Sequence, residues 1–273
     1  MPELPEVETV VRSLCPQVKG RTIRAVKLGK HRLRAPWQSR WSQHVTGCTI
    51  VDITRRGKWM LLELSRPATH LIVHLGMTGR LLVEPAHAKP QVHTHFRFPL
   101  DNGQEELRFR DPRRFGSVTL AETMDGHRFP QEAELGPEPF DLTPKELLAS
   151  MQRSKRPLKA ILLDQTVVAG VGNIYADEAL YEAKLLPTRL GTSLTAKEAK
   201  RLQQVIVKVL TRAIETKGST ISNFYYGNDE AGSFQHEFQA YGRAKQPCYR
   251  CDRPMVGIRL AGRATCFCVG CQR

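Results

Sequence analysis

The chain has 273 residues, enough for one large domain or two modest ones, and its formal net charge is +14. Apolar residues make up 41% and charged residues 25%, a balance that argues against global disorder. No stretch approaches the roughly 20 apolar residues of a membrane span, and the acidic start MPELPEVETV lacks the features of a signal peptide. We therefore expect neither a secreted nor a membrane protein, and the basic excess favours a polyanionic partner, usually nucleic acid.

The first predicted helix covers residues 3–14. Its apolar side chains recur at helical spacing, at Leu4, Val7, Val11 and Leu14. Three acids, Glu3, Glu6 and Glu8, lie in the first turns, where they suit the helix dipole.

Pro2 would carry a secondary amine at the start of this helix once Met1 is removed. An α-amine has a pKa near 8, so roughly a tenth of it is neutral and nucleophilic at pH 7. Attack of such an amine on a sugar aldehyde or C1′ gives a cationic iminium, which draws electrons for elimination at the neighbouring carbon. Glu3, the next residue, could donate or accept protons. A proline at the first helical position is also common without such a role, so both explanations stay open.

Short β-rich runs follow from about residue 22 to residue 121, separated by Gly, Pro and Asn-Gly signals. Examples are residues 22–28, 48–53, 59–64, 70–75, 94–100 and 115–121. Runs at this spacing predict an antiparallel sandwich or barrel.

A helical region follows the Pro/Gly-rich linker AELGPEPF (133–140). Thr143 with Glu146, and Thr195 with Glu198, fit capping boxes that begin helices. The second box precedes an apolar stripe over 202–214, which we expect to be core. The chain is therefore divided into a β-domain (1–132), a helical domain (133–242) and a Cys-rich module (243–273).

The last module contains two C-x2-C pairs, Cys248 with Cys251 and Cys268 with Cys271, and 16 residues separate them. This spacing is typical of a structural zinc site in which four thiolates close a tetrahedron and leave no position for substrate. We expect Cys266 to be a strand residue beside this site.

Arg259 and Arg263 lie between the pairs, on an expected β-hairpin with Gly262 at its turn. An arginine at a rigid hairpin tip can reach a phosphate with a forked donor, although an ordinary solvated arginine remains the alternative.

The positive charge is segregated along the chain. Residues 1–130 hold 21 Lys and Arg against 12 Asp and Glu, residues 131–242 hold 13 against 14, and residues 243–273 hold 7 against 1. Nine Lys and Arg, and no acid, lie between Glu8 and Asp52. This pattern favours a surface that meets phosphates from two separate modules.

Several segments together resemble one family. They include PELPEVET (2–9), RRGKWMLLEL (55–64), HLGMTGRL (74–81), RDPRRFG (110–116), VVAGVGNIYADE (167–178), FQHEFQAYGR (234–243) and the four-Cys tail. In this combination the chain resembles the bacterial formamidopyrimidine-DNA glycosylases, which excise oxidised purines. The resemblance implies an α+β multidomain fold: an N-terminal helix with an antiparallel β-sandwich, a helical domain with a helix-two-turn-helix motif, and a C-terminal zinc β-hairpin, with DNA gripped between domains.

The resemblance also implies the chemistry. Pro2 attacks C1′ of the damaged nucleotide, the base leaves, and β- and δ-elimination cut the strand. Glu3 acts as the general acid and Glu6 as a supporting carboxylate. Lys58 lies near the reacting phosphate and sugar, and Arg263 assists at the phosphate; by itself Lys58 could equally be a strand-edge cation.

The implied DNA contacts divide into two groups. Lys58, His74, Asn173 and Arg263 bind phosphates, and Asn173 does so at a helix start where amides favour anions. Met77, Arg113 and Phe115 fill the stack left by the flipped base, although Met77 and Phe115 would more usually be core residues. Lys159 is implied near the lesion strand, and residues 218–232 form a loop that closes over the flipped base.

The expected cofactor is one structural Zn²⁺, with no organic cofactor. The expected partner is double-stranded DNA with oxidised bases, such as 8-oxoguanine and formamidopyrimidines, or abasic sites. We expect a monomer in the bacterial cytoplasm, associated with the nucleoid through DNA.

Two alternatives remain open. The first is an endonuclease VIII-like glycosylase for oxidised pyrimidines, a branch that usually lacks the Met/Arg/Phe trio. The second is a non-enzymatic zinc-ribbon protein that binds nucleic acid, which composition and Cys spacing fit equally well.

Overall fold

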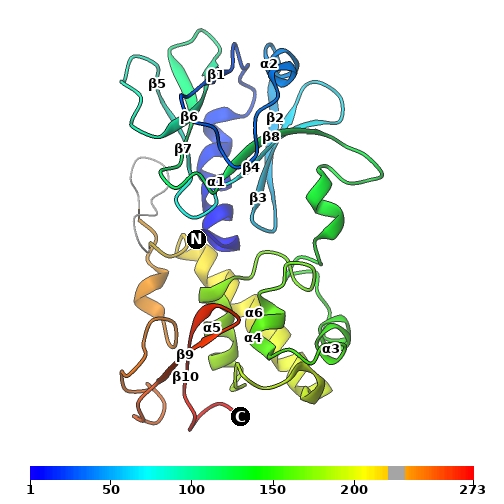
Figure 1. Ribbon diagram of the computed structural model, residues 1–273, viewed down its shortest axis with the longest axis vertical. Helices are drawn as coiled ribbons and strands as arrows, with labels where there is room; N and C mark the ends of the chain where they lie inside the picture. The colour runs from blue at the N-terminus through cyan, green and yellow to red at the C-terminus, as the bar shows by residue number, and fades with distance from the viewer. Residues whose placement is uncertain (221–230) are drawn as a thin grey trace. The chain divides into compact units, whose positions relative to one another are not determined.

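The computed structural model describes residues 1–220 and 231–273 (Figure 1). The chain divides into two compact units. Unit 1 comprises Met1–Ala133 with Lys217–Gly232, and unit 2 comprises Glu134–Thr216 with Ser233–Arg273. Most of the expected helical domain and the Cys-rich module therefore lie in one unit, while residues 217–232 belong to the other.

Unit 1 contains two four-stranded antiparallel sheets, of order β1-β6-β7-β5 and β2-β3-β4-β8. Their strands are Lys27–Leu28 (β1), Ile50–Arg56 (β2), Trp59–Leu64 (β3), Thr69–His74 (β4), Arg80–Pro85 (β5), Thr94–Leu100 (β6), Glu105–Arg110 (β7) and Ser117–Glu122 (β8). The helices near them are Leu4–Val18 (α1) and Ser39–Val45 (α2), and Pro130–Glu134 (η1) is a 3₁₀ turn. Helix α1 contacts β2, β3 and β5, so it packs against both sheets.

The sequence of α1 explains where this helix begins and which face it buries. Glu3 is the N-cap residue and forms a reciprocal capping box with Glu6, while Pro5 occupies the first turn. The helix continues to Val18, beyond the expected end at residue 14. Its apolar stripe is buried in one core with both sheets, at Val7, Val10, Val11, Leu14 and Val18.

Strands β5 and β7 lie within the β-rich region expected over residues 22–121, between the runs given as examples, and β7 buries charged side chains. Glu106 and Arg108 are 0% and 2% exposed. Arg108 Nε donates to Glu106 at 2.9 Å, and Arg97 on β6 forms a forked pair with the same carboxylate at 2.7 and 2.8 Å. A buried carboxylate held by two guanidiniums satisfies its hydrogen-bonding capacity, so a strand with a polar sequence can lie inside the sheet.

Unit 2 packs helices with one hairpin. Its elements are Pro144–Gln152 (α3), Leu158–Leu162 (α4), Asn173–Glu182 (α5), Gly191–Ser193 (η2), Ala196–Glu215 (α6), Phe234–Glu237 (η3), Val256–Leu260 (β9) and Arg263–Phe267 (β10). Both expected capping boxes are confirmed, at Thr143 with Glu146 and at Thr195 with Glu198. The apolar stripe of α6 is buried, as expected. With the two sheets of unit 1, this arrangement confirms the expected fold class.

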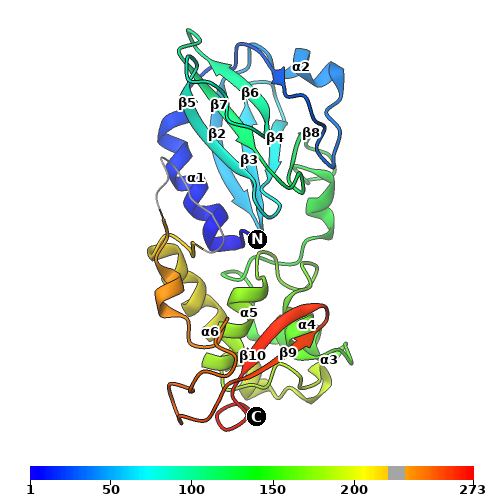
Figure 2. The same ribbon diagram turned by 60° about the vertical axis from the view of Figure 1, so that its left-hand side comes forward.

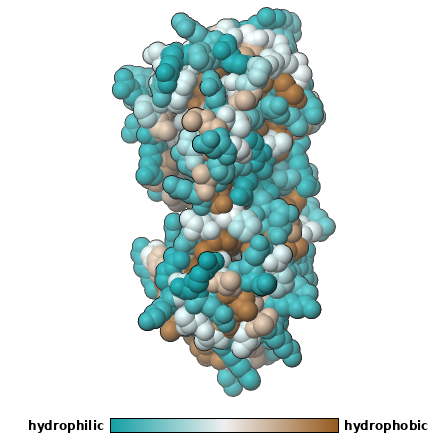
Figure 3. Space-filling model, turned by 90° about the vertical axis from the view of Figure 1, so that its right-hand side faces the viewer, coloured by the Kyte–Doolittle hydropathy of each residue, from teal (hydrophilic) through white to brown (hydrophobic). Residues whose placement is uncertain are grey.

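Hydrophilic side chains cover most of the face shown in Figure 3, and hydrophobic ones form only small patches on it. Among the described helices, none has both the length and the hydropathy needed to cross a bilayer.

The cap of α6 gives a direct test of local stability. The Thr195 side chain accepts a hydrogen bond from the Glu198 amide at 3.3 Å. We expect Thr195→Ala to lower the free energy of unfolding by about 1 kcal/mol, because one amide of the first turn loses its acceptor. Chemical denaturation measures this change. Thr188→Ala, at an exposed residue that caps no helix, is the control and should stay within about 0.5 kcal/mol of the parent.

Candidate active site and nucleic-acid interface

The N-terminal residues expected to carry the chemistry are held at the start of α1. Pro2 is buried, and Glu3 and Glu6 are each 2% exposed. Glu6 Oε2 accepts the Glu3 amide at 2.9 Å, which fixes the backbone one residue after Pro2. Both views of unit 1 place the N-terminus beside the turn between β2 and β3 (Figures 1 and 2).

Glu6 also holds a segment far away in the sequence. Its second oxygen, Oε1, accepts the amide of Ser219 at 2.8 Å and the hydroxyl of Ser219 at 2.9 Å. Gly218 has φ +75, and a Cβ there would lie 2.9 Å from the same Glu6 oxygen, so this close approach favours glycine. Glu6 therefore joins the N-terminus to the beginning of segment 218–232. Residues 221–230 of that expected loop lie outside the described residues.

Lys58 and His74 lie close together at one end of the second sheet. Lys58 follows Gly57 in the turn between β2 and β3, and His74 ends β4, directly opposite Trp59 of β3. The Trp59 and His74 rings are 4.6 Å apart. Lys58 is 7% exposed, and its charge opposes protonation of His74. Lys58 and His74, which are both expected to bind phosphate, therefore lie in the same corner of unit 1.

The protonation state of the His74 ring follows from its surroundings. Burial, with the positive charge of Lys58 as a second cause, lowers the pKa of His74 from 6.5 to about 4. The Gly76 amide donates to Nδ1 at 3.1 Å, so Nδ1 carries no proton. The neutral ring must then carry its proton on Nε2. His74 is thus a neutral N–H donor, not a cation.

Met77, Arg113 and Phe115 lie on two turns that touch each other, the 76–79 turn and the 113–116 turn. Met77 is half-buried, whereas Arg113 and Phe115 are exposed. The Arg113 guanidinium lies 4.8 Å from the centre of the Phe115 ring. The Phe115 ring is half-exposed, so it is accessible from outside the molecule.

Unit 2 positions Asn173 and Arg263 on two different elements. Asn173 is the first residue of α5, directly after Gly172, as the sequence predicted. Its Oδ1 is buried without a hydrogen-bond partner among the described residues. Arg263 is exposed next to the hairpin turn, where Ala261 and Gly262 have φ +48 and +74. A tight turn of this kind holds Arg263 on a short rigid tip.

Lys159 differs from its expected position beside the DNA strand, because it is fully buried. Its ammonium lies 2.7 Å from Asp177 Oδ1 and donates to the Ala264 carbonyl at 2.8 Å and to Thr265 Oγ1 at 2.9 Å. A side chain with no exposed surface cannot touch a DNA strand here, so we correct this expectation. Lys159 instead links α4 and α5 to strand β10, the strand that begins at Arg263.

The four expected metal ligands converge on one point. The sulfurs of Cys248, Cys251, Cys268 and Cys271 all lie within 4.8 Å of one another, and two of their separations are 3.9 and 3.5 Å. A tetrahedron with Zn–S bonds of about 2.3 Å places sulfurs about 3.8 Å apart, so the cluster fits a metal ion.

Cys266 lies on β10 and outside this cluster, in agreement with the sequence-based expectation. Burial raises the pKa of its thiol to about 11, which keeps it protonated and disfavours metal binding.

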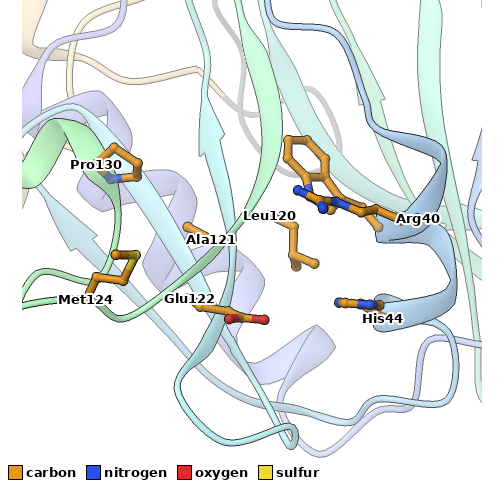
Figure 4. A pocket seen from close by; sticks show the side chains of 8 residues that line it. Arg40, His44, Leu120, Ala121, Glu122, Met124 and Pro130 are labelled. Carbon is orange, nitrogen blue, oxygen red and sulfur yellow. The ribbon is translucent and has the colours of Figure 1, made fainter.

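A surface pocket of about 360 Å³ lies between α2 and β8, and Figure 4 shows its lining side chains. Arg40, His44 and Glu122 face it together with apolar side chains, among them Leu120 and Met124. None of the expected site residues lines it, so it is separate from the candidate active site.

Sequence reasoning missed three residues that hold this site together: Asp111, His95 and Ser219. Asp111 is fully buried between the 76–79 and 113–116 turns, and His95 Nε2 lies 2.9 Å from its carbonyl oxygen. Asp111 lies within the RDPRRFG motif and Ser219 near the start of segment 218–232, but the sequence predicted no role for either side chain. His95 lacks distinctive neighbours in the sequence.

Sequence models of two domains match the chain. The formamidopyrimidine-DNA glycosylase N-terminal domain matches residues 1–118, and the formamidopyrimidine-DNA glycosylase H2TH domain matches residues 135–225. Proteins named formamidopyrimidine-DNA glycosylase from Desulforamulus reducens and Geobacillus kaustophilus are each 42% identical to the chain over 277 residues. Those alignments cover 100% of this chain and 99% and 100% of the two relatives.

Solved structures agree with this match. MutM (Fpg) from Thermus thermophilus is 41% identical with a TM-score of 0.87, covering 99% of this chain and 98% of that chain. Lactococcus lactis Fpg in complex with Fapy-dG containing DNA is 33% identical with a TM-score of 0.90, covering 99% and 100%. The same protein with abasic-site DNA is 33% identical with a TM-score of 0.89, covering 99% of each chain.

The neutral state of His74 predicts a pH dependence of stability. Folding lowers its pKa from 6.5 to about 4, so between these values the unfolded chain binds more protons than the folded one. Stability should therefore fall as the pH falls from 6.5 to 4, and His74→Gln should flatten that part of the profile. An NMR titration checks the cause directly: a His74 pKa near 6.5 in the folded protein would contradict it.

The cysteine cluster predicts a selective loss of metal. Cys268→Ser should remove bound zinc and weaken DNA binding, because three thiolates no longer close the tetrahedron that supports the hairpin. Metal analysis and binding titrations measure both effects. Cys266→Ser, a buried cysteine on the same strand, is the matched control and should keep its metal; DNA binding that survives the loss of metal in Cys268→Ser would refute the supporting role.

Proposed function

The chain belongs to the formamidopyrimidine-DNA glycosylase family, and from this membership we propose how it acts as a DNA glycosylase for oxidised purines. The substrates are 8-oxoguanine and formamidopyrimidines in duplex DNA, and the enzyme also has the lyase activity that is general in the family. An enzyme for oxidised pyrimidines is not favoured, because the relatives that match over the full length carry the formamidopyrimidine name. The same full-length match disfavours a non-enzymatic zinc-ribbon protein.

The observation that carries the proposed chemistry is the position of Pro2 and Glu3 at the start of α1. Removal of Met1 turns Pro2 into a secondary amine. The Glu6 carboxylate holds the Glu3 amide at 2.9 Å, which supports a fixed geometry for the preceding proline. Reacting groups that are held in place gain rate through reduced loss of entropy.

The reaction follows from that amine. Its lone pair forms a bond to C1′ as the bond from C1′ to the base breaks, and the proton that the nitrogen then loses balances the one that the departing base takes up. Loss of the ring oxygen from C1′ then gives an iminium, and Glu3 donates the proton that the opening sugar oxygen needs. The iminium acidifies C2′, so β-elimination expels the 3′ phosphate and δ-elimination the 5′ phosphate. Water finally releases the enzyme.

The proposed DNA contacts use both units. Lys58 and His74 bind phosphate beside the reacting sugar, the first as a cation and the second as a neutral donor. Asn173 and Arg263 bind phosphate from unit 2, and Arg263 assists the reaction there. Met77, Arg113 and Phe115 enter the space that the flipped base leaves, which offsets the cost of unstacking it.

Glu6 acts indirectly in this proposal. Both of its oxygens are occupied, one by the Glu3 amide and the other by Ser219. We therefore assign it a positioning role that joins the reactive N-terminus to segment 218–232. Segment 218–232 is proposed to close over the flipped base.

We propose that the four cysteines hold one structural Zn²⁺, because four thiolates leave it no open position. The ion would stiffen the hairpin that carries Arg263. The proposed chemistry uses the protein's own amine and calls for no organic cofactor. We propose that the chain works through three functional segments, which are residues 1–132, 133–242 and 243–273. We also infer a monomer that acts on chromosomal DNA in the bacterial cytoplasm.

A trapping experiment tests the proposed chemistry. Incubation with duplex DNA that contains 8-oxoguanine opposite cytosine, followed by borohydride, should reduce the iminium to a stable protein–DNA adduct. The adduct should be absent from Pro2→Gly and from protein that retains Met1, because neither offers the secondary amine. Denaturing gel electrophoresis detects it. Lack of an adduct from protein without Met1, or an adduct from Pro2→Gly of equal yield, would refute the role of Pro2.

A further inference from the structure

Asp111 is a buried acid that the proposed chemistry does not use. It follows strand β7 and is 0% exposed. Its side-chain oxygens accept three neutral donors: Oδ1 accepts the Thr78 hydroxyl at 2.5 Å and the Arg113 amide at 3.2 Å, and Oδ2 accepts the Gly116 amide at 2.8 Å. A carboxylate that is taken out of water must keep such donors, because leaving it unbonded is costly.

The donors come from two turns that are far apart in the sequence. Thr78 belongs to the 76–79 turn, whereas Arg113 and Gly116 belong to the 113–116 turn. The Thr78 hydroxyl donates to Asp111 and also accepts the Arg113 amide at 3.2 Å. One hydroxyl therefore bridges the acid and the other turn.

The backbones of the two turns also touch. A Cβ at Gly76 would lie 2.4 Å from the Gly116 nitrogen, and Gly76 has φ +61. A Cβ at Gly116 would lie 2.7 Å from the His74 carbonyl oxygen. Real Cβ atoms do not approach backbone this closely, so both positions require glycine. The two turns meet without side chains between them. The hydrogen bonds of Asp111 fix how the 76–79 turn lies against the 113–116 turn.

We propose that Asp111 and Thr78 form a clamp that presents Met77, Arg113 and Phe115 as one rigid group for insertion into the duplex. The clamp fixes the spacing of the two turns when the base is extruded. Both clamp residues act through the side chains on the turns, so they are positioning residues. The proposal rests on the proposed function, since it assumes that this protein extrudes a damaged base.

The test uses the hydroxyl of Thr78. Thr78→Val keeps the shape of the side chain and removes both hydrogen bonds, whereas Thr78→Ser keeps the hydroxyl. We expect Thr78→Val to slow excision of 8-oxoguanine about tenfold, because Asp111 loses its hydroxyl donor, whereas the Arg113 amide keeps Asp111 as an acceptor. Cleavage at a preformed abasic site should change much less, because no base has to be extruded there. Thr78→Ser should restore most of the excision rate.

The discriminating readout is the ratio of excision to abasic-site cleavage in single-turnover assays. A general loss of structure would lower both rates together, which would overturn the clamp. Equal ratios in Thr78→Val and Thr78→Ser would also overturn it. Thr69→Val is the matched control, because Thr69, on β4, is 1% exposed and donates to the Pro67 carbonyl, away from both turns; its ratio should equal that of the parent protein.

Asp111→Asn gives a second test without DNA. An amide offers one acceptor oxygen and places an NH2 group against a donor, so at least one of the three bonds must break. Hydrogen exchange should speed up at the amides of Arg113 and Gly116 while helix α1 keeps its protection. Unchanged exchange at both amides would refute the clamp. Excision of 8-oxoguanine by the parent protein tests the proposed function separately. The proposed function and the clamp can therefore fail independently.

Discussion

A carboxylate that folding removes from water must find donors, and in this protein that requirement joins the segments that carry the site. Glu6 binds the Glu3 amide and Ser219, which is 213 residues away. Asp111 binds the 76–79 and 113–116 turns. In unit 2, Asp177 meets Lys159 and the Cys266 amide, and Glu178 accepts three amides over 239–241. Burial raises the pKa of Asp177 to about 7, and Lys159 opposes that rise.

Part of the positive charge lies on residues outside the proposed site. Lys30, Arg32, Arg34 and Arg40 are exposed, and none of them has an acidic partner among the described residues. Such cations strengthen attraction to any duplex but select no lesion. The backbone at Glu3, Arg113 and Gly116 is held instead by hydrogen bonds to the buried carboxylates of Glu6 and Asp111. His74 illustrates the difference, because its lowered pKa makes it a directional donor whose strength does not depend on charge.

The sequence predicted those features that depend on local spacing. The capping boxes at Thr143 and Thr195, the start of α5 at Asn173 and the cysteine cluster all follow from residues a few positions apart. Features that depend on tertiary contacts were not predictable. The burial of Lys159 comes from Asp177 and the hairpin, about 18 and 105 positions away. The burial of Glu106 on β7 was not predictable for the same reason, because Arg97 on a neighbouring strand neutralises it.

The choice of donors around Asp111 matters for Arg113. Both residues belong to one short segment, and an ion pair between their side chains would be the obvious arrangement. Instead Asp111 binds the Arg113 backbone amide, while the guanidinium lies over the Phe115 ring. An ion pair would have to break before Arg113 could meet a base, and breaking it inside a buried site is costly. A cation on an aromatic face is held weakly. The acid can therefore fix the turn and leave the guanidinium available for DNA.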